Sequence, residues 1–274
     1  MTDEIIRTEN LKKNFGKLEV LKGIDLSVMK GEVISIIGPS GGGKSTFLRC
    51  LNLLEIPDEG KIFFEGTDIM TKQKDISKYR QKIGMVFQNF NVFPNLTVLD
   101  NITLAPRLEK KVPKKDAEEE AMTLLKRVGL EDKAAEYPRK LSGGQKQRLS
   151  IAGILAMEPK CIIMDEPTAM LDPGGRREVM KAIKDLLAEN LSVVLITHYM
   201  EEAVEADYIY VMDQGHVVMA GTPVEIFSDI DTIRRYGLEP PQVVQVVDLL
   251  NSKGIKLDRS ILTTEELIKA LCQR

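Results

Sequence analysis

Hydrophobic positions follow two different periods along this chain of 274 residues. Near its start, apolar residues alternate with polar ones over residues 4–29, which predicts strands of a small antiparallel sheet. Further along, short runs that are almost entirely apolar predict buried strands. These runs are VISIIG, IGMVFQ, CIIMDE, SVVLITH and YIYVMD, and the run KIFFEGTDI predicts one more strand, at a sheet edge.

Helical spacing of apolar residues occupies most of the remaining chain. It predicts a helix that ends before Pro57, mostly helical structure over about 89–157, and an amphipathic helix ended by Asn190. Gln214-Gly215 predicts the turn of a hairpin, and short helices are expected from Pro223 onward.

Strands that alternate with helices imply a parallel sheet core in an α/β fold. We therefore expect an α/β domain over residues 1–222, with a helical insertion at about 89–158. A helical C-terminal extension should follow over residues 223–274. The length suffices for one full core with such an appendage.

Composition excludes several classes of protein. The formal net charge is −3, so no global basic field indicates a nucleic-acid partner. The apolar runs are much shorter than the roughly 20 residues of a membrane helix, and the N-terminus lacks the layout of a signal peptide. Three cysteines without a pattern favour neither a disulfide framework nor a zinc site. We expect a soluble protein in a reducing cytoplasm.

A glycine-rich loop over residues 38–46 follows the predicted strand VISIIG and precedes a predicted helix. It matches G-x-x-x-x-G-K-[ST], a pattern whose backbone N–H groups wrap the phosphates of a nucleotide. We expect Lys44 to reach the β- and γ-phosphates and the Ser45 hydroxyl to bind Mg²⁺. The predicted nucleotide-binding residues are Gly38, Pro39, Ser40, Gly41, Gly42, Gly43, Lys44, Ser45 and Thr46.

Polar residues end several of the apolar runs. Asp165 and Glu166 close CIIMDE, where Asp165 can supply a carboxylate for the Mg²⁺ and Glu166 can act as the general base. A buried strand that simply reaches a polar loop is the alternative, and the glycine-rich loop upstream favours the functional interpretation. His198 and Gln88 also follow strands, where ligands collect in such sheets, and Gln88 is a further candidate metal ligand. Both His198 and Gln88 are equally compatible with a structural role.

A second glycine-rich stretch, Leu-Ser-Gly-Gly-Gln over residues 141–145, opens a predicted helix. It has the elements of a phosphate site, but no lysine followed by serine or threonine. Phe15, which precedes the P-loop, could stack on adenine, and it fits a core or surface position equally well.

Together these motifs resemble those of the ATP-binding cassette (ABC) ATPases of membrane transporters, in the family order through Phe227. The matching motifs are the aromatic A-loop at Phe15, the P-loop, the Q-loop at Gln88, LSGGQ, IIMDE, the D-loop AMLD and the switch residue His198. The resemblance implies a P-loop NTPase core with a parallel sheet, an N-terminal antiparallel β subdomain and a helical insertion. It also implies hydrolysis of ATP with Mg²⁺.

The same resemblance implies a head-to-tail dimer, which explains the second glycine-rich stretch. Ser142, Gly143, Gly144 and Gln145 would form a half-site for the γ-phosphate bound to the other subunit, whose own Lys44 supplies the cation. The other subunit would be a second copy of this chain or a paired ABC ATPase. Its further partners would be integral membrane permease subunits, and its location the inner face of the cell membrane.

The two halves of the chain resemble different importers. Up to about Leu141 the chain is similar to ATPases of polar amino acid importers, and from Gln145 it is similar to those of energy-coupling factor importers for vitamins or transition metals. Such a hybrid pattern fits a recombined gene, an engineered chimera or a divergent branch. In the P-loop, Gly42 stands where the family usually has serine.

The segment 89–107, where membrane subunits of this family dock, is of the amino acid importer kind. We therefore expect import of a polar amino acid, with an energy-coupling factor importer as the alternative. A single-cassette ATPase outside transport, as in iron–sulfur assembly, is a further alternative.

Overall fold

The computed structural model describes residues 3–71, 76–187 and 191–273. The chain divides into two compact units. We call the unit of Ile6–Val28, Glu32–Phe63 and Leu195–Arg274 the P-loop unit. We call the unit of Met1–Ile5, Met29–Gly31 and Phe64–Val194 the helical unit. The predicted helix end at Asn190 lies outside the described residues.

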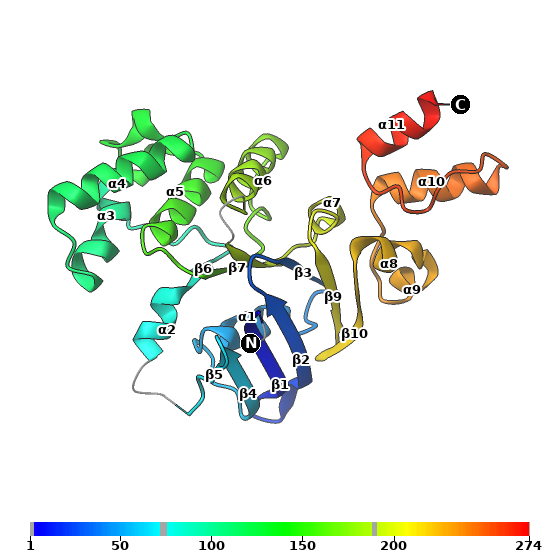
Figure 1. Cartoon of the computed structure of the whole chain (residues 1–274), viewed down its shortest axis with the longest axis horizontal. Helices are drawn as coiled ribbons and strands as arrows, with labels where there is room; N and C mark the ends of the chain where they lie inside the picture. Colours follow the sequence, from blue (N-terminus) through cyan, green and yellow to red (C-terminus); the bar gives the residue numbers. More distant parts are fainter. Residues whose placement is uncertain (1–2, 72–75, 188–190, 274) are drawn as a thin grey trace. The chain divides into compact units, whose positions relative to one another are not determined.

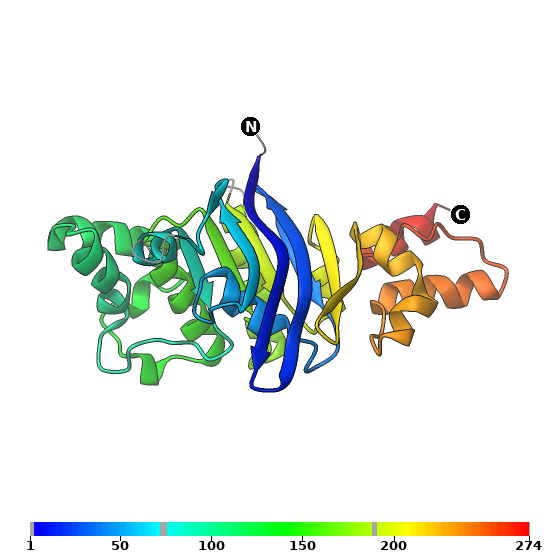
Figure 2. The ribbon, with the colours of Figure 1, turned by 90° about the horizontal axis from the view of Figure 1, so that it is seen from below.

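A long hairpin begins the P-loop unit. Strands β1 (Glu4–Phe15) and β2 (Leu18–Met29) lie side by side in Figure 2, with β4 (Glu59–Phe64) on the other side of β1. Only two residues join β1 to β2, and such a short connection requires antiparallel strands. Leu11 and Ile24 are fully buried, so the alternating apolar positions form one inner face.

The P-loop unit also contains part of a parallel sheet. Strand β3 (Val33–Ile37) pairs in parallel with β9 (Tyr208–Asp213), which pairs antiparallel with β10 (His216–Gly221). The predicted hairpin turn is confirmed, because Gln214 and Gly215 both have positive φ, at 46° and 83°. This is the backbone that a tight hairpin turn needs.

Helices complete the P-loop unit. Helix α1 (Lys44–Leu51) follows the glycine loop, and α7 (Met200–Ala203) follows the segment of His198. The extension forms the helices α8 (Pro223–Ser228), α9 (Ile230–Arg235), α10 (Gln242–Ser252) and α11 (Thr264–Cys272). Phe227 and Val244 of this extension are buried in one apolar cluster with Ile209 of β9.

The helical unit combines a parallel strand pair with a helical cluster. Strand β6 (Ile83–Val86) pairs in parallel with β7 (Cys161–Asp165). Figure 1 shows α3, α4 and α5 grouped together, and Leu125 and Ala152 are buried in their common core. The remaining elements are β5 (Thr67–Asp68), α2 (Ile76–Lys82), α3 (Val98–Glu109), α4 (Lys114–Arg127), short 3₁₀ turns at Glu131–Lys133 and Pro138–Lys140, α5 (Gly143–Leu155) and α6 (Pro173–Leu187). Strand β8 (Ser192–Ile196) includes residues of both units, as β1, β2 and β4 do at one end.

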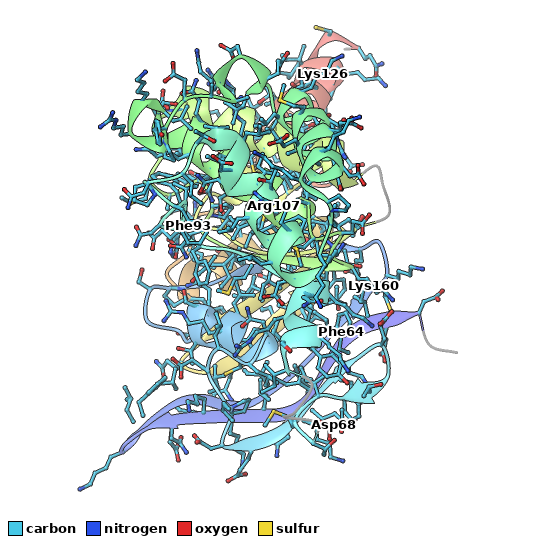
Figure 3. The ribbon with its side chains drawn as sticks, turned by 90° about the vertical axis from the view of Figure 1, so that its left-hand side faces the viewer. Phe64, Asp68, Phe93, Arg107, Lys126 and Lys160 are labelled. Atoms are coloured by element: carbon cyan, nitrogen blue, oxygen red, sulfur yellow. The ribbon has the colours of Figure 1, made fainter. Side chains whose placement is uncertain are left out.

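Side chains around Glu65 brace the edge of this unit. The Glu65 carboxylate pairs with the ammonium groups of Lys82 and Lys160, and Lys82 also lies 5.9 Å from the centre of the Phe64 ring. Phe64 and Lys160 are labelled close to one another in Figure 3. Since Lys82 ends α2 and Lys160 precedes β7, the cluster ties these elements together.

The α/β fold with parallel and antiparallel strands is the one that the hydrophobic pattern predicts. One strand prediction is wrong: KIFFEGTDI forms β4 and β5 separately, because Glu65 and Gly66 turn the chain with φ of 49° and 73°. Helices α2 and α7 were not predicted. Across the described residues, the helices lack the combination of length and hydropathy that would let one cross a bilayer.

Candidate functional site

The P-loop connects a buried strand to a helix. Apolar residues of β3 fix its end in the sheet, and the chain then leaves through Gly38, whose φ is 149°. A Cβ built at Gly38 would lie 1.9 Å from the carbonyl oxygen of Met212, so a side chain cannot be accommodated there. The loop is held further at Gly42, whose carbonyl oxygen accepts a hydrogen bond from the Gly215 N–H at 3.2 Å.

Lys44 lies inside this loop. Its side chain is only 5% exposed, and Nζ donates to the carbonyl oxygens of Gly38 and Pro39, both at 2.8 Å. Gly43, the residue before α1, has no side chain that caps the helix. A buried ammonium beside an uncapped helix N-terminus suits an anion with several oxygens, because the first-turn N–H groups have no acceptor within the helix. The loop therefore fits the phosphates of a nucleotide.

Two further predicted residues belong to the same unit as this loop. Ser45 lies in the first turn of α1 and is partly exposed, so a hydroxyl ligand for a metal ion is available next to the phosphate cradle. Phe15 ends β1 and is 46% exposed, with the Lys13 ammonium 5.2 Å from its ring centre. Lys13 is anchored by donating to the Ile56 carbonyl oxygen at 2.7 Å.

Lys13 was not predicted as a site residue. The sequence did contain a signal for Lys13, because it precedes Phe15 by two residues on a predicted strand, and residues two apart on a strand share one face. A cation on one face of an exposed ring leaves the other face for a flat ligand. Phe15 is therefore a surface residue rather than a core residue, and its environment is compatible with stacking on a flat ligand.

His198 follows β8 and is exposed. The residues on either side of it are held by a buried polar pair in which Thr197 Oγ1 donates to Glu202 Oε2 at 2.6 Å. Thr197 Oγ1 in turn accepts a hydrogen bond from the Tyr199 N–H at 3.0 Å. Thr197 and Glu202 were missed by the sequence analysis, although a threonine that continues an apolar strand is a visible signal.

The helical unit holds the predicted acidic residues. Asp165 ends the buried strand β7 and is 6% exposed, while Glu166 is partly exposed and has φ of 50°. A positive φ is unfavourable for glutamate, and such strain concentrates at functional sites. The geometry places two carboxylates with different exposure at the carboxyl end of a parallel strand, where ligands bind in α/β sheets.

Gln88 lies at the corresponding end of β6 and is exposed. The loop that follows it is held by Asn101, whose Oδ1 accepts from the Phe93 N–H at 2.7 Å and whose Nδ2 donates to the Thr97 carbonyl oxygen at 2.8 Å. Phe93, labelled in Figure 3, is 54% exposed. A rigid loop thus presents an aromatic side chain to solvent.

The second glycine-rich stretch begins α5. Ser142 is the N-cap: its Oγ accepts from the Gln145 N–H at 3.3 Å, and Gln145 Oε1 accepts from the Ser142 N–H at 2.9 Å. This capping box leaves the first-turn N–H groups of Gly143 and Gly144 without acceptors inside the helix. The pattern S-x-x-Q is the sequence signal for this capping box, which was not predicted.

The predicted site residues are thus divided between the two units. The P-loop unit contains Phe15, the loop from Gly38 to Thr46, and His198, and the helical unit contains Gln88, Ser142, Gly143, Gly144, Gln145, Asp165 and Glu166. In each unit, one predicted glycine-rich stretch lies at a helix N-terminus and offers backbone N–H groups, at α1 and at α5. The start of α1 has a buried lysine at its first position and no side-chain cap, whereas the start of α5 has a cap and glycine at its first position.

Comparison with known families gives a match to the ABC transporter model over residues 21–169. A curated relative from Bacillus subtilis (strain 168), the arginine transport ATP-binding protein ArtM, is 50% identical over 224 residues, which are 81% of this chain and 93% of ArtM. The energy-coupling factor transporter ATP-binding protein EcfA1 of Clostridioides difficile (strain 630) is 43% identical over 280 residues, covering 99% of both chains.

Solved structures agree with these matches. The structure of cbiO1 from Clostridium perfringens, part of the ABC transporter complex cbiONQ, has a TM-score of 0.78 at 34% identity, and the match covers 91% of this chain and 99% of that one. The dimeric cassette MJ0796 in a post-hydrolysis state with ADP and Pi has a TM-score of 0.73 at 33% identity, with 80% of this chain and 98% of that chain covered.

Proposed function

Since this chain belongs to the ABC transporter family, as the ATP-hydrolysing subunit of an importer, we propose that the imported substrate is a polar amino acid. The observation that carries the proposal is the loop after Gln88. Its residues are of the amino acid importer kind, and Asn101 holds it so that Phe93 is exposed. The identity to ArtM supports the same substrate class.

The proposed roles of the P-loop unit follow from its geometry. The Lys44 ammonium, which is paired with two loop carbonyl oxygens, would exchange them for oxygens of the β- and γ-phosphates. Phe15 would stack on adenine through the ring face that Lys13 leaves open. Thr197 and Glu202 would hold His198 at the γ-phosphate.

In the helical unit we assign Glu166 as the general base that takes the proton of the attacking water. The family motifs further imply that Ser45 of the P-loop unit, together with Asp165 and Gln88, would hold the Mg²⁺ that accompanies ATP, which would neutralise charge on the transferred phosphoryl group. A carboxylate held in a strained backbone is pre-positioned, so little reorganisation precedes the proton transfer.

We propose a head-to-tail dimer in which the N-terminus of α5 serves the nucleotide of the other subunit. The first-turn N–H groups and the Ser142 hydroxyl would bind the γ-phosphate there. The dimeric structure of the MJ0796 cassette supports association into a dimer. The ATPase would act at the inner face of the cell membrane, attached to permease subunits.

A second candidate function is the energy-coupling factor ATPase for vitamin or transition-metal uptake. The specific observation is the extension over residues 223–274. EcfA1 matches 99% of this chain, whereas the match to ArtM covers 81% of it. In that function the other subunit would be a different, paired ABC ATPase.

Uptake by intact cells separates the two functions. In cells that produce this protein together with its membrane subunits, Glu166→Gln should abolish uptake of labelled arginine or glutamine and leave riboflavin and cobalt uptake unchanged. Glu120→Gln alters an exposed carboxylate of α4 and should leave all uptake unchanged. Loss of vitamin or cobalt uptake alone would contradict the amino acid proposal and support the second function.

A further inference from the structure

One face of α5 lies along the segment 84–90, which contains the end of β6 and the Q-loop residue Gln88 (Figure 1). At one end of this contact, a Cβ built at Gly143 would lie 3.4 Å from Phe90 Cζ. At the other end, a Cβ built at Gly84 would lie 2.2 Å from Ile154 Cγ2, so helix and strand approach as closely as a glycine allows.

Gln147 forms the polar contact in the middle of this face. Its side chain is 0% exposed, and Nε2 donates to the Phe87 carbonyl oxygen at 3.4 Å. Positions 143, 147 and 154 are four and seven residues apart, which places them on one side of a helix. This hydrogen bond therefore acts on Phe87, the residue directly before Gln88.

The Gln147 amide is only half satisfied. Within the described part of the chain, its Oε1 is buried and has no hydrogen-bond partner. A buried polar atom without a partner is unfavourable, so an apolar side chain of similar size would serve stability equally well. What an apolar side chain lacks is the donor to Phe87.

We infer that Gln147 is a positioning residue that holds the Q-loop and helix α5 together, so that Gln88 and Ser142 move as one body. The inference rests on the proposed roles of these two residues. The contacts of Gly143 with Phe90 and of Ile154 with Gly84 are apolar, whereas the amide of Gln147 makes a directional contact between α5 and Phe87. Movement of the Q-loop on binding ATP or a permease would thus reach the N-terminus of α5 directly.

The first test is Gln147→Met, which keeps the length of the side chain and removes the donor. We expect kcat for ATP hydrolysis to fall about tenfold, because small displacements of catalytic groups have effects of this order. The KM for ATP should stay within about twofold, since the P-loop unit binds the nucleotide, and the melting temperature should not fall. An unchanged kcat, or a kcat that falls only together with the melting temperature, would overturn the inference.

The second test, Gln147→Glu, restores the donor through pH. An ionised carboxylate cannot donate to Phe87, but the protonated acid can, and burial raises the pKa of a carboxyl at this position. The kcat of the variant relative to the unmodified protein should therefore rise about fivefold or more between pH 8.5 and pH 6. A ratio that stays well below one at pH 6 would overturn the inference, and it would do so even if Gln147→Met failed to fold.

Gln245→Glu is the matched control for the pH test. Gln245 lies in α10 and also donates through Nε2 to a backbone carbonyl oxygen, that of Pro240 at 2.8 Å. Its kcat ratio should stay near one at both pH values. If the Gln245 variant showed the same rise, the pH effect would not belong to the Q-loop contact and the inference would fail.

Gln88→Ala separates this inference from the proposed function. If Gln88→Ala retains full ATPase activity, the proposed role of Gln88 is wrong, and the inference falls with it. If Gln88→Ala is inactive and Gln147→Met is fully active, the proposed role stands and only the positioning inference is overturned. The expected result is that both variants lose kcat, with the larger loss at Gln88.

Discussion

The two glycine-rich helix starts of this protein differ in how they are stabilised. At α1 the preceding residue, Gly43, offers no side-chain cap, and the buried Lys44 ammonium is bound to carbonyl oxygens of its own loop. At α5 the residues Ser142 and Gln145 cap the helix reciprocally, and glycine occupies the first helical position that Lys44 occupies in α1.

The difference indicates two kinds of phosphate site. The loop before α1 has a cation and uncapped N–H groups, so it gains most when an anion enters it. The start of α5 is complete without a ligand and can add N–H groups to an anion that is already held elsewhere. In the head-to-tail dimer that we propose, the first site would capture ATP and the second would add N–H groups to an ATP that is already bound.

Removing the ammonium group of Lys44 should have the largest effect, which is a loss of affinity for ATP. Lys44→Ala should weaken ATP binding at least about 100-fold, because two or more charge-assisted hydrogen bonds of roughly 1.5–3 kcal/mol each are lost. Titration with a fluorescent ATP analogue measures the change. Lys146→Ala, in the first turns of α5, is the control and should leave the affinity unchanged. Equal losses in both variants would abolish the distinction between the two helix starts.

Blocking the N-terminus of α5 should lower kcat for ATP hydrolysis without weakening the binding of ATP. Ser142→Arg places a bulky cation at the helix N-terminus, and we expect kcat to fall about 100-fold, since an interaction made only in the closed state is lost. Binding of the ATP analogue should stay within about twofold of the unmodified protein. A parallel loss of binding would mean that α5 helps to capture ATP within its own chain.

A smaller change tests the cap itself. Ser142→Ala removes the oxygen that accepts from Gln145 and should lower the free energy of unfolding by about 1 kcal/mol. Thermal denaturation should show a shift of about 2–4 °C. Thr263→Ala removes the equivalent oxygen from the capping box of α11 and should destabilise the chain without changing ATP hydrolysis. An unchanged melting temperature in the Ser142 variant would show that the cap contributes nothing.

The smallest expected effect is a difference in the rates at which the three cysteines are alkylated. Burial raises the pKa of the Cys50 thiol to about 12 and that of the Cys161 thiol to about 12, so both should be almost entirely protonated at pH 8. Cys272 is exposed and should react first with iodoacetamide, as mass spectrometry of tryptic peptides will reveal. Because Cys50 lies in α1, fast labelling there would indicate that the P-loop helix opens readily, contrary to its packing.

The sequence was sufficient for the elements with strong periodicity. The β9–β10 hairpin and the helices α10 and α11 follow their predicted patterns, since their apolar spacing and turn residues agree. Helix α2 has no buried residue, and so it left no hydrophobic period to detect. The break between β4 and β5 depends on positive φ at Glu65, which glutamate rarely adopts.

For the candidate site, motifs identified the residue types but not their hydrogen-bond partners. The pairing of Lys44 with loop carbonyl oxygens depends on the fold of the loop. Gln147 gave no signal, because a single glutamine in a helix is usually exposed and only the packing of α5 on the segment 84–90 buries it. The strained backbone of Glu166 likewise emerges only in the folded chain.

The division between capture at α1 and completion at α5 is tested most directly by light scattering on Glu166→Gln, with and without Mg-ATP. This variant should bind ATP without hydrolysing it, so we expect a monomer that becomes a dimer when ATP is added. Adding Ser142→Arg to the same chain should abolish the dimer while ATP binding persists. A Glu166→Gln protein that binds ATP and stays monomeric would contradict this account, in which two copies of this chain form a dimer and α5 of each copy completes the ATP site of the other.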